Sequence, residues 1–494
     1  MIILEEIEFL KIKELLLAQK DDYGEIFLVG GYVRDAILKK PSKDLDFVVT
    51  KNAAKAARCI ADKFCGDYYL LDRQRETARA LVTLNGQQLI VDTAIMNGEK
   101  IEDDLKKRDF SINAMAINLL EPNHLIDPLC GKKDLEQQRL KPCSEKSFLD
   151  DPIRTLRAIR FIQSLSLNYD SHVGQAIISA SHDLNNISGE RIHYELSQIF
   201  IIKDVMQSLN LMVEFGLLKI LFPELELLRK ISPRSPHVAD AFTHTLKVIE
   251  LTRFFLENIS GITNNAQSEL ISDVLSLVKV YKIQLAKFLE DLAGGHLSIY
   301  FLTVIAALYH DSGKAFINPD EVNGNTLFPG HAEKSAEIAR VRMKVLTFSN
   351  DEIHFVRSVI RFHMSDELKT IGAAENSERD IYRFFQKTGK TGIVIAFLHL
   401  ADIIATYEGT LKPERWSVAL KSVKKILDGW FNHFDEVVAP PRLLNGDDLI
   451  EIYKIKPGQE LGQILEQISG EQAAGTIKDR NAAFALAEKL IFRK

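Results

Sequence analysis

The chain has 494 residues, a length that predicts several domains rather than one. Its formal net charge is −6, so binding to nucleic acid would need a local basic surface rather than an overall basic excess. Four cysteines without a C-x-x-C pair argue against a structural zinc site and a disulfide framework. The sequence contains no apolar run of about 18 residues. Its N-terminal apolar stretch includes acidic residues, which favours an amphipathic helix over a signal peptide, so we expect a cytoplasmic enzyme without a membrane anchor.

Short segments rich in β-branched residues are concentrated in the first part of the chain. With the helical patterns at 33–39 and 53–64 between them, they predict an α/β domain with a small mixed sheet. The predicted strands are 26–31, 45–50, 79–84, 88–95 and 114–119.

From about residue 150 onward, apolar residues recur at spacings of three and four, which predicts helices nearly throughout. Prolines at 223, 233, 236, 440 and 441 mark expected boundaries, and 260–267 is an expected loop. We therefore predict four parts: an α/β catalytic head at 1–140, an all-α neck and body at 141–232, an all-α third domain at 233–410 and a helical tail at 411–494.

The segment from Gly30 to Asp46 combines a glycine turn with two carboxylates. Gly30 and Gly31 follow a predicted strand, where the missing side chains let a phosphate approach backbone N–H groups and the N-terminus of the next helix. Asp44 and Asp46 alternate on the next strand, so both carboxylates project from one face and can bind Mg²⁺. Asp92, on a neighbouring strand, is a third candidate carboxylate. The combination predicts metal-dependent nucleotide transfer, whereas D-x-D alone is more often a solvated strand end.

Four motifs in this order resemble those of the bacterial-type (class II) CCA-adding enzymes and poly(A) polymerases, within the DNA polymerase β superfamily. The resemblance implies that the head transfers nucleotides from CTP and ATP to the 3′ end of a tRNA. It also implies that the following all-α parts select the nucleotide and bind the RNA. The motifs are LVGGYVRDAILKKPSKDLDFVV (28–49), KKRDFSINAMAI (106–117), DDPIRTLRAIRF (150–161) and GERIHYELSQI (189–199).

The second motif supplies groups that can hold a nucleotide. Arg108 can pair with a phosphate, Asp109 can accept hydrogen bonds from ribose hydroxyls, and Asn113 offers an amide to either. The alternative is that Arg108 and Asp109 form only a surface ion pair.

The third motif places a carboxylate and a guanidinium three residues apart on a predicted helix, hence on one face. The resemblance implies that Asp151 and Arg154 act as a protein template that selects C or A, while Arg157 and Arg160 reach the triphosphate. An ordinary amphipathic helix is the alternative. The nucleotide-binding candidates are Gly30, Gly31, Arg34, Arg108, Asp109, Asn113, Asp151, Arg154, Arg157 and Arg160.

The connection after the predicted strand of Asp92 is short. Only 14 residues, 93–106, separate Asp92 from Lys107, and they include no arginine. In full CCA-adding relatives, a longer flexible loop there helps to switch the pocket from C to A, and enzymes that add only CC lack much of it. The sequence therefore leaves both a CCA product and a CC product open.

A second constellation of histidines and aspartates resembles the H…HD…D pattern of HD domains. Imidazole and carboxylate ligands together favour Ni²⁺, Mn²⁺, Co²⁺, Fe²⁺ or Zn²⁺. The resemblance implies a phosphohydrolase activity on RNA ends, although a lone histidine on an apolar helix is more often a packed core residue. His237, His296, His354 and His399 lie outside the pattern and are given no role. The candidate ligands are His244, His310, Asp311, His331, His363 and Asp402.

The C-terminal segment 441–468 resembles the tail of those CCA-adding enzymes that carry an HD domain. A turn at Pro457–Gly458 precedes a predicted helix whose N-terminus could hold an RNA phosphate, although an ordinary helical hairpin fits equally well. Two other functions share most of these features. One is a poly(A) polymerase of the same family, and the other is an HD-domain signalling hydrolase with a nucleotide-sensing N-terminal domain.

Overall fold

The computed structural model describes residues 7–259, 268–290, 299–322, 324–407 and 409–492. The chain divides into two compact units, which are described separately below: 1–187 with 211–220, and 188–210 with 221–494. The loop expected at 260–267 and the first six residues of the expected N-terminal helix lie outside the described residues.

A seven-stranded mixed sheet forms the centre of the first unit, with strand order β3-β4-β5-β2-β1-β6-β7. β2 and β5 are parallel, and the other neighbouring strands are antiparallel. The predicted fold class, an α/β head with a small mixed sheet followed by helical parts, is confirmed. The strands are β1 (Ile26–Val29), β2 (Asp44–Val49), β3 (Asp67–Asp72), β4 (Thr77–Leu84), β5 (Gln87–Ile95), β6 (Ala116–Asn118) and β7 (Leu125–Ile126).

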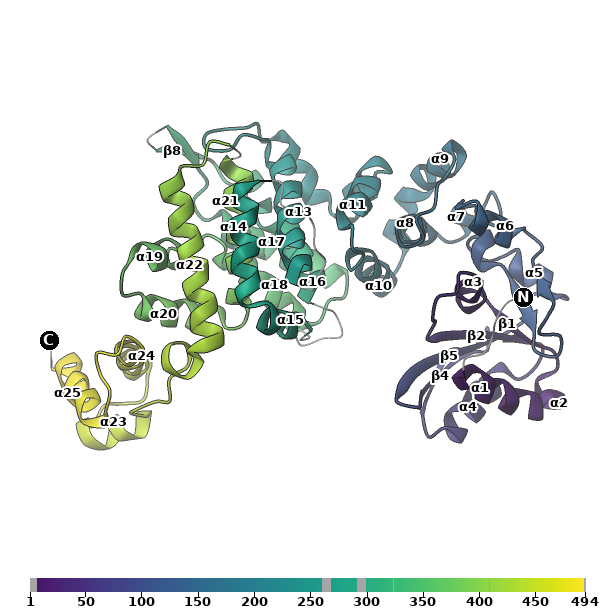
Figure 1. Ribbon diagram of the computed structural model, residues 1–494, viewed down its shortest axis with the longest axis horizontal. Helices are drawn as coiled ribbons and strands as arrows, with labels where there is room; N and C mark the ends of the chain where they lie inside the picture. The colour runs from purple at the N-terminus through teal and green to yellow at the C-terminus, as the bar shows by residue number, and fades with distance from the viewer. Residues whose placement is uncertain (1–6, 260–267, 291–298, 323, 408, 493–494) are drawn as a thin grey trace. The chain divides into compact units, whose positions relative to one another are not determined.

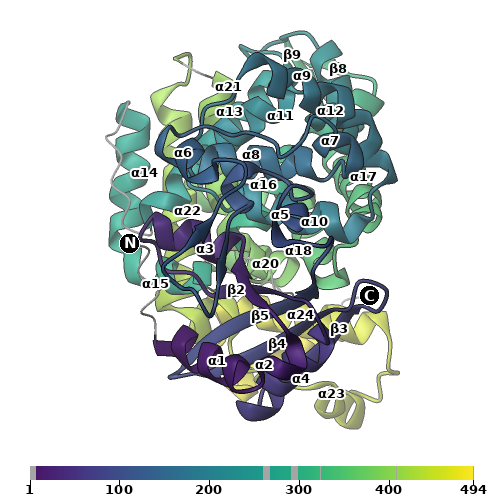
Figure 2. The ribbon, with the colours of Figure 1, turned by 90° about the vertical axis from the view of Figure 1, so that its right-hand side faces the viewer.

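Helices cover both faces of this sheet. α1 (Ile7–Ala18) and α4 (Ala53–Lys63) lie on one face and α3 (Gly31–Ile37) lies on the other (Figures 1 and 2). Alanines such as Ala53, Ala56 and Ala57 form the buried side of α4, and their small side chains let the helix pack closely. The remaining helices of this unit include α2 (Lys20–Tyr23), α5 (Ile101–Leu105), α6 (Gly131–Glu136), α7 (Ser147–Asp150), α8 (Arg154–Ser164) and α9 (Ser171–Ala180).

Two features of the first unit differ from the sequence-based prediction. Strand β3 was not predicted, because Tyr69, Leu70 and Leu71 are all largely exposed and show no alternation of buried and exposed positions. The predicted helix through Asp151 is also wrong at its start. Asp151 has an extended backbone, with φ of −150°, and α8 begins only at Arg154. The cause is Pro152, which disfavours a helical conformation in the residue before it.

The second unit is built from helices around an apolar centre. α16 (Ile299–Tyr309) and α21 (Thr391–Tyr407) are buried along most of their length, and α13 (Ala241–Ile259) packs against both. The surrounding elements are α10 (Gly189–Phe200), α14 (Glu269–Val280), α15 (Lys282–Glu290), α17 (His331–Val345), α18 (Asn350–Phe362), α19 (Glu367–Ala373), α20 (Glu378–Thr388), α22 (Pro413–Asn432) and the hairpin of β8 (Asp320–Val322) and β9 (Asn325–Leu327).

The C-terminal helices have a small apolar core of their own. Leu449, Leu461 and Ile464 lie at its centre. It joins α23 (Gly446–Tyr453), α24 (Gln459–Ala473) and α25 (Arg480–Ile491), and α24 is the helix predicted after Gly458.

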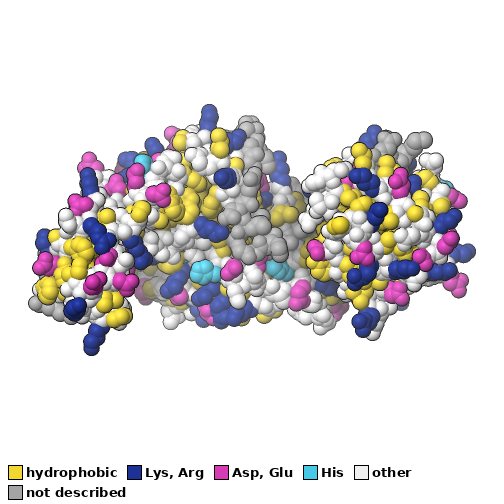
Figure 3. Space-filling view, turned by 90° about the horizontal axis from the view of Figure 1, so that it is seen from below, with side chains coloured by type: hydrophobic (Ala, Val, Ile, Leu, Met, Phe, Trp, Pro, Cys, Tyr) yellow, Lys and Arg dark blue, Asp and Glu magenta, His cyan; other side chains and the backbone are white. Residues whose placement is uncertain are grey.

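On the face seen in Figure 3, basic and acidic side chains are interspersed.

Among the helices of the described ranges, none taken singly is long and apolar enough to cross a membrane, while α20 and α21, bent by 106° at their junction, pass that test only as a pair.

Candidate functional site

The glycine turn at the end of β1 brings two charged side chains close to the backbone. Gly30 has a φ of 73°, which a residue with a side chain rarely adopts, and its N–H donates to the Met115 carbonyl over 3.2 Å. A Cβ atom at Gly30 would lie 3.1 Å from Arg108 Nη1 and 3.2 Å from Asp46 Oδ2. Glycine therefore leaves the space that Arg108 and Asp46 need beside the N-terminus of α3.

The carboxylates of β2 lie in an environment that penalises their charge. Burial raises the pKa of Asp46 to about 6, and the charges of Asp92 and Asp44 add to this effect against the opposing influence of Arg108. Burial and the charge of Asp92 also raise the pKa of Asp44. Carboxylates that repel one another in this way are suited to bind a divalent cation.

Asp92 lies beside Asp46 in the parallel pairing of β2 and β5, but its carboxylate is held by Arg79. Arg79 Nε and Nη2 each donate to one oxygen of Asp92, both over 2.8 Å. Within the described ranges, groups of three ligand atoms within 4.8 Å of one another occur only in the helical unit, so Asp44, Asp46 and Asp92 do not form one. Arg79 was not singled out from the sequence; its cross-strand position opposite Asp92 in the β4–β5 hairpin was the available signal.

The nucleotide-binding candidates of three motifs meet at Asp109. Its carboxylate accepts hydrogen bonds from Asn113 Nδ2 (3.1 Å) and Arg157 Nε (2.9 Å). Burial alone would raise the pKa of Asp109, but the charge and hydrogen bond of Arg157, with help from Asn113, hold it below its ordinary value. Arg34 Nη1 donates to Asn113 Oδ1 over 2.7 Å, which joins the first motif to this network.

Arg154 is fixed by the backbone of the second motif. Its guanidinium donates to Ser147 Oγ (2.8 Å) and to the carbonyls of Lys107 (2.9 Å) and Arg108 (3.2 Å). Asp151 lies in the turn before α8 and not on the same helix. The pair predicted to share one helical face is therefore presented by a turn and a helix start.

Three guanidinium groups surround the ring of Phe161 on α8. Those of Arg34, Arg157 and Arg160 lie 5.3, 5.5 and 4.6 Å from the ring centroid. Cation–π contacts with this one ring bring three positive charges close together.

The short connection after β5 is a tied turn. The Asn97 N–H donates to Asp104 Oδ2 over 3.0 Å. Lys107 Nζ donates to the carbonyl and the side-chain oxygen of Asn97, both over 2.8 Å. Three side-chain contacts thus close this connection onto α5.

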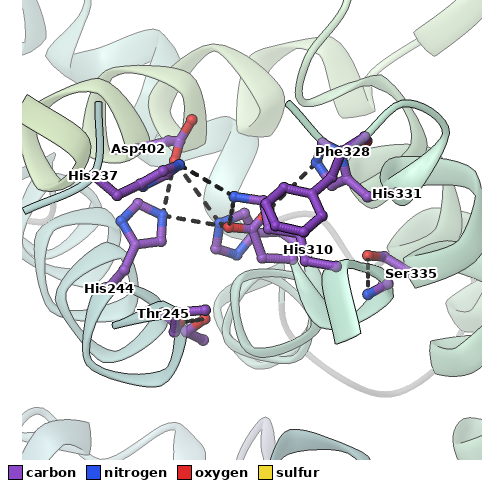
Figure 4. A network of polar contacts seen from close by, with 12 residues as sticks. His237, His244, Thr245, His310, Phe328, His331, Ser335 and Asp402 are labelled. Carbon is purple, nitrogen blue, oxygen red and sulfur yellow. Dashed lines mark hydrogen bonds and ion pairs between the residues drawn. The ribbon is translucent and has the colours of Figure 1, made fainter. Parts of the chain in front are cut away.

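The histidines and aspartates of the second constellation converge in the helical unit (Figure 4). Asp311 lies between two histidine pairs. Its Oδ2 is 3.6 Å from His244 Nε2 and 3.4 Å from His310 Nε2. Its Oδ1 is 3.4 Å from His331 Nε2 and 3.9 Å from His363 Nε2. The two groups of possible metal ligands therefore share one carboxylate.

The rings of these histidines are oriented by the backbone. Nδ1 of His310, His331 and His363 lies 2.8, 2.7 and 2.6 Å from the carbonyl three residues earlier. Because a carbonyl only accepts, Nδ1 carries the proton and the lone pair of Nε2 faces Asp311. This arrangement is typical of metal-binding histidines. Asp402 lies beside His244, with its Oδ1 3.0 Å from His244 Nε2.

Burial keeps the ligand candidates in the protonation state that a metal requires. It lowers the pKa of His363 to about 3 and also lowers the pKa of His310. Burial alone would raise the pKa of Asp311, but the charge of Lys314, whose Nζ lies 2.6 Å from Oδ2, holds it well below its usual range. Neutral imidazoles around ionised carboxylates fit a divalent transition ion.

His237, to which the sequence pattern assigned no role, lies beside this cluster. The centroid of its ring is 4.9 Å from that of His244, and its Nε2 is 3.4 Å from Lys314 Nζ. Its loop position shows no periodicity that could have indicated the contact.

Comparisons with known proteins cover both units. Residues 26–141 match the model of the poly A polymerase head domain, and 168–228 match the probable RNA and SrmB-binding site of polymerase A. The CC-adding tRNA nucleotidyltransferase of Synechocystis is 26% identical over 469 residues, which cover 94% of this chain and 93% of the relative. The A-adding tRNA nucleotidyltransferase of Deinococcus radiodurans is 25% identical, with 94% of each chain covered.

A solved CCA-adding enzyme in complex with ATP has a TM-score of 0.62 at 22% identity, with 98% of this chain and 95% of that chain covered. The similarity in fold to this structure covers the helical unit as well as the head. Enzymes with this head are nucleotidyltransferases that depend on divalent metal ions. The head at 26–141 is therefore similar to that of the poly(A) polymerases, and nearly the whole chain is similar to tRNA nucleotidyltransferases, which supports a nucleotidyltransferase.

Proposed function

We propose that the protein is a template-independent tRNA nucleotidyltransferase that extends tRNA 3′ ends with nucleotides from nucleoside triphosphates. The observation that carries this proposal is the convergence of Gly30, Asp46 and Arg108 at one turn. The relatives aligned over nearly the whole chain are named tRNA nucleotidyltransferases, which favours this activity over polyadenylation. The charged residues of the transferase motifs and the candidate metal ligands of the helical unit are all present. This argues against an N-terminal domain that has lost catalysis and only senses nucleotides.

Asp44 and Asp46 would hold Mg²⁺, since burial and the nearby charge of Asp92 raise their pKa values and a divalent cation offsets both effects. When bound, Mg²⁺ activates the attacking hydroxyl and stabilises the departing pyrophosphate. Arg79 keeps Asp92 in place beside them. Asp92 then shapes the field at the site and serves as a third carboxylate only when it leaves Arg79.

The nucleotide would lie between the glycine turn and α8. Arg108 and the guanidinium groups around Phe161 would bind the triphosphate, while Asp109 and Asn113 would bind the ribose. Asp151 and Arg154 would read the base edge. Because Arg154 already donates to two carbonyls and Ser147, its plane is fixed before a base arrives.

The product that the geometry favours is CC. A pocket that switches from C to A needs a segment that can move, and the connection after β5 is closed by Asn97, Asp104 and Lys107. Asp104 also accepts a hydrogen bond from Arg108, which couples this turn to the nucleotide site.

The test uses tRNA transcripts that lack CCA or end in CC, incubated with CTP, ATP or both, followed by sequencing of the 3′ ends. CTP should add two residues to the first transcript, and the transcript ending in CC should stay unextended. Addition of a terminal A would refute the argument from the tied turn. A long A tail would identify a poly(A) polymerase, and no extension at all would reject the transferase.

Variants connect the activity to the site. Asp44→Ala combined with Asp46→Ala should abolish addition. Asp67→Ala is the matched control, because Asp67 is an exposed carboxylate at the start of the edge strand β3 and should tolerate the change.

The helical unit supports a second candidate function, a metal-dependent phosphohydrolase of the HD type. The specific observation is that Asp311 faces two pairs of imidazoles with one oxygen toward each. Such a site would hold one or two ions such as Ni²⁺, Mn²⁺, Co²⁺, Fe²⁺ or Zn²⁺. When bound, these ions supply a water nucleophile at neutral pH. Its substrate would be a phosphorylated or cyclic RNA 3′ end that has to be repaired before extension.

A further inference from the structure

A pocket opens beside the candidate metal ligands on the side of the loop that contains His237. It is partly open to solvent and includes His244 and Asp311 in its wall. The rest of the wall combines apolar groups such as Phe328 with three nitrogen-bearing side chains, those of Arg234, His237 and Lys314. None of these three belongs to the six candidate ligands.

Lys314 is paired with the candidate ligand Asp311. Its ammonium lies 2.6 Å from Asp311 Oδ2, the oxygen that faces His244 and His310. A metal ion on that oxygen would repel the ammonium at such a distance. The lysine would then turn its charge toward the pocket, where His237 Nε2 is already 3.4 Å away.

Arg234 stands at the rim of the same pocket. Its nearest carboxylate is that of Glu321, at 3.8 Å, and 51% of its side chain is exposed. An exposed pair at this distance contributes little free energy, so the guanidinium is available for a stronger anionic partner.

We propose that this pocket is an anion subsite, in which Arg234, His237 and Lys314 bind the phosphoryl group of the substrate processed at the neighbouring metal cluster. The proposal rests on the proposed phosphohydrolase site and specifies how its substrate is held. Positive groups on the rim and ligand histidines on the inner wall would place a tetrahedral dianion between them. Guanidinium and ammonium groups are the usual protein partners of such oxygens.

The experiment measures binding rather than turnover. The full chain is loaded with Mn²⁺, and the dissociation constant of inorganic phosphate is determined by calorimetry for the wild type, Arg234→Gln and His237→Asn. Loss of a hydrogen bond to a charged group should weaken phosphate binding by about 10-fold or more. Arg361→Gln is the matched control, because Arg361 is an exposed arginine on α18 that pairs with Glu333 away from the pocket. The affinity for Mn²⁺ should be the same in all four proteins.

Each outcome bears on a different step. If Mn²⁺ binds and phosphate does not, or if both pocket variants bind phosphate as the wild type does, the subsite is refuted while the metal site stands. If Mn²⁺ itself fails to bind, the metal site and the subsite fall together. Competition then separates the sources of the phosphoryl group. Displacement of phosphate by cytidine 2′,3′-cyclic phosphate supports an RNA end, and displacement by ATP alone supports a free nucleotide.

Discussion

At the scale of single residues, Asp46 shows a conflict between stability and function. Its pKa is about 6 in the folded protein, above the ordinary value of 3.8. The folded state therefore keeps a proton that the unfolded chain has lost between these two pH values. In metal-free protein, stability falls as the pH rises through this window and is constant above it.

Asp46→Asn should remove this loss of stability at high pH. In EDTA at pH 8, the variant should be more stable than the wild type by on the order of 1–3 kcal/mol, with no gain below about pH 4. Denaturant unfolding followed across this pH range measures the difference, and nucleotide addition should be lost. Asp67→Asn, on the exposed end of β3, is the control. A gain that is equal at pH 4 and pH 8 would contradict this account of the charge.

Cys143 offers a second test at this scale. Burial and the negative charge of Asp109 raise the pKa of its thiol to about 12. Because the thiolate is the reactive species, Cys143 should be alkylated by iodoacetamide far more slowly at pH 8 than the exposed Cys65 and Cys130. Mass spectrometry of the modified peptides gives the three rates. Similar rates for all three cysteines would contradict the raised pKa that burial and the charge of Asp109 give to Cys143.

Residues that lie within a sequence motif could be predicted as candidates, whereas their partners from other segments could not. Asp46 and Arg108 belong to motifs, and each motif has its own chemical pattern. Arg79 and His237 are connected to the sites only by the pairing of β4 with β5 and by the path of a loop. Neither connection leaves a periodic signal in the chain.

At the scale of elements, periodicity predicted the long buried helices and the central strands, because burial on one face imposes a spacing. It failed at β3, whose side chains are exposed, and at the start of α8, where the backbone preference of Pro152 overrides the helical pattern. Local backbone preferences thus determine where an element begins or ends. Apolar spacing alone predicts elements that are too long.

The start of α18 is stabilised by a capping box. Ser349 Oγ accepts a hydrogen bond from the N–H of Glu352, whose carboxylate accepts one from the N–H of Ser349. Ser349→Ala should destabilise the helical unit by about 1 kcal/mol. Calorimetry should record a lower unfolding temperature, whereas Ser276→Ala, on the exposed side of α14, should have almost no effect. Equal melting of both variants would mean that the cap contributes nothing.

At the scale of the molecule, the two candidate sites share no residue. The transferase candidates all lie within 1–187, and the metal-ligand candidates all lie within 221–494. Each unit has its own apolar centre, so a change at one site need not disturb the fold around the other. The finer division into head, neck, third domain and tail stays a prediction.

This separation predicts that a variant at one site loses Mn²⁺ binding and a variant at the other site loses tRNA extension. His310→Ala removes an imidazole that lies 3.4 Å from Asp311, so Mn²⁺ binding at the histidine cluster should be lost while tRNA extension persists. Asp44→Ala should abolish extension and leave Mn²⁺ binding at the histidine cluster unchanged. Calorimetric unfolding must accompany both assays, because His310 is fully buried and its truncation leaves a cavity. If correctly folded His310→Ala no longer extends tRNA, the sites are coupled, and the cluster then serves the transferase rather than a reaction of its own.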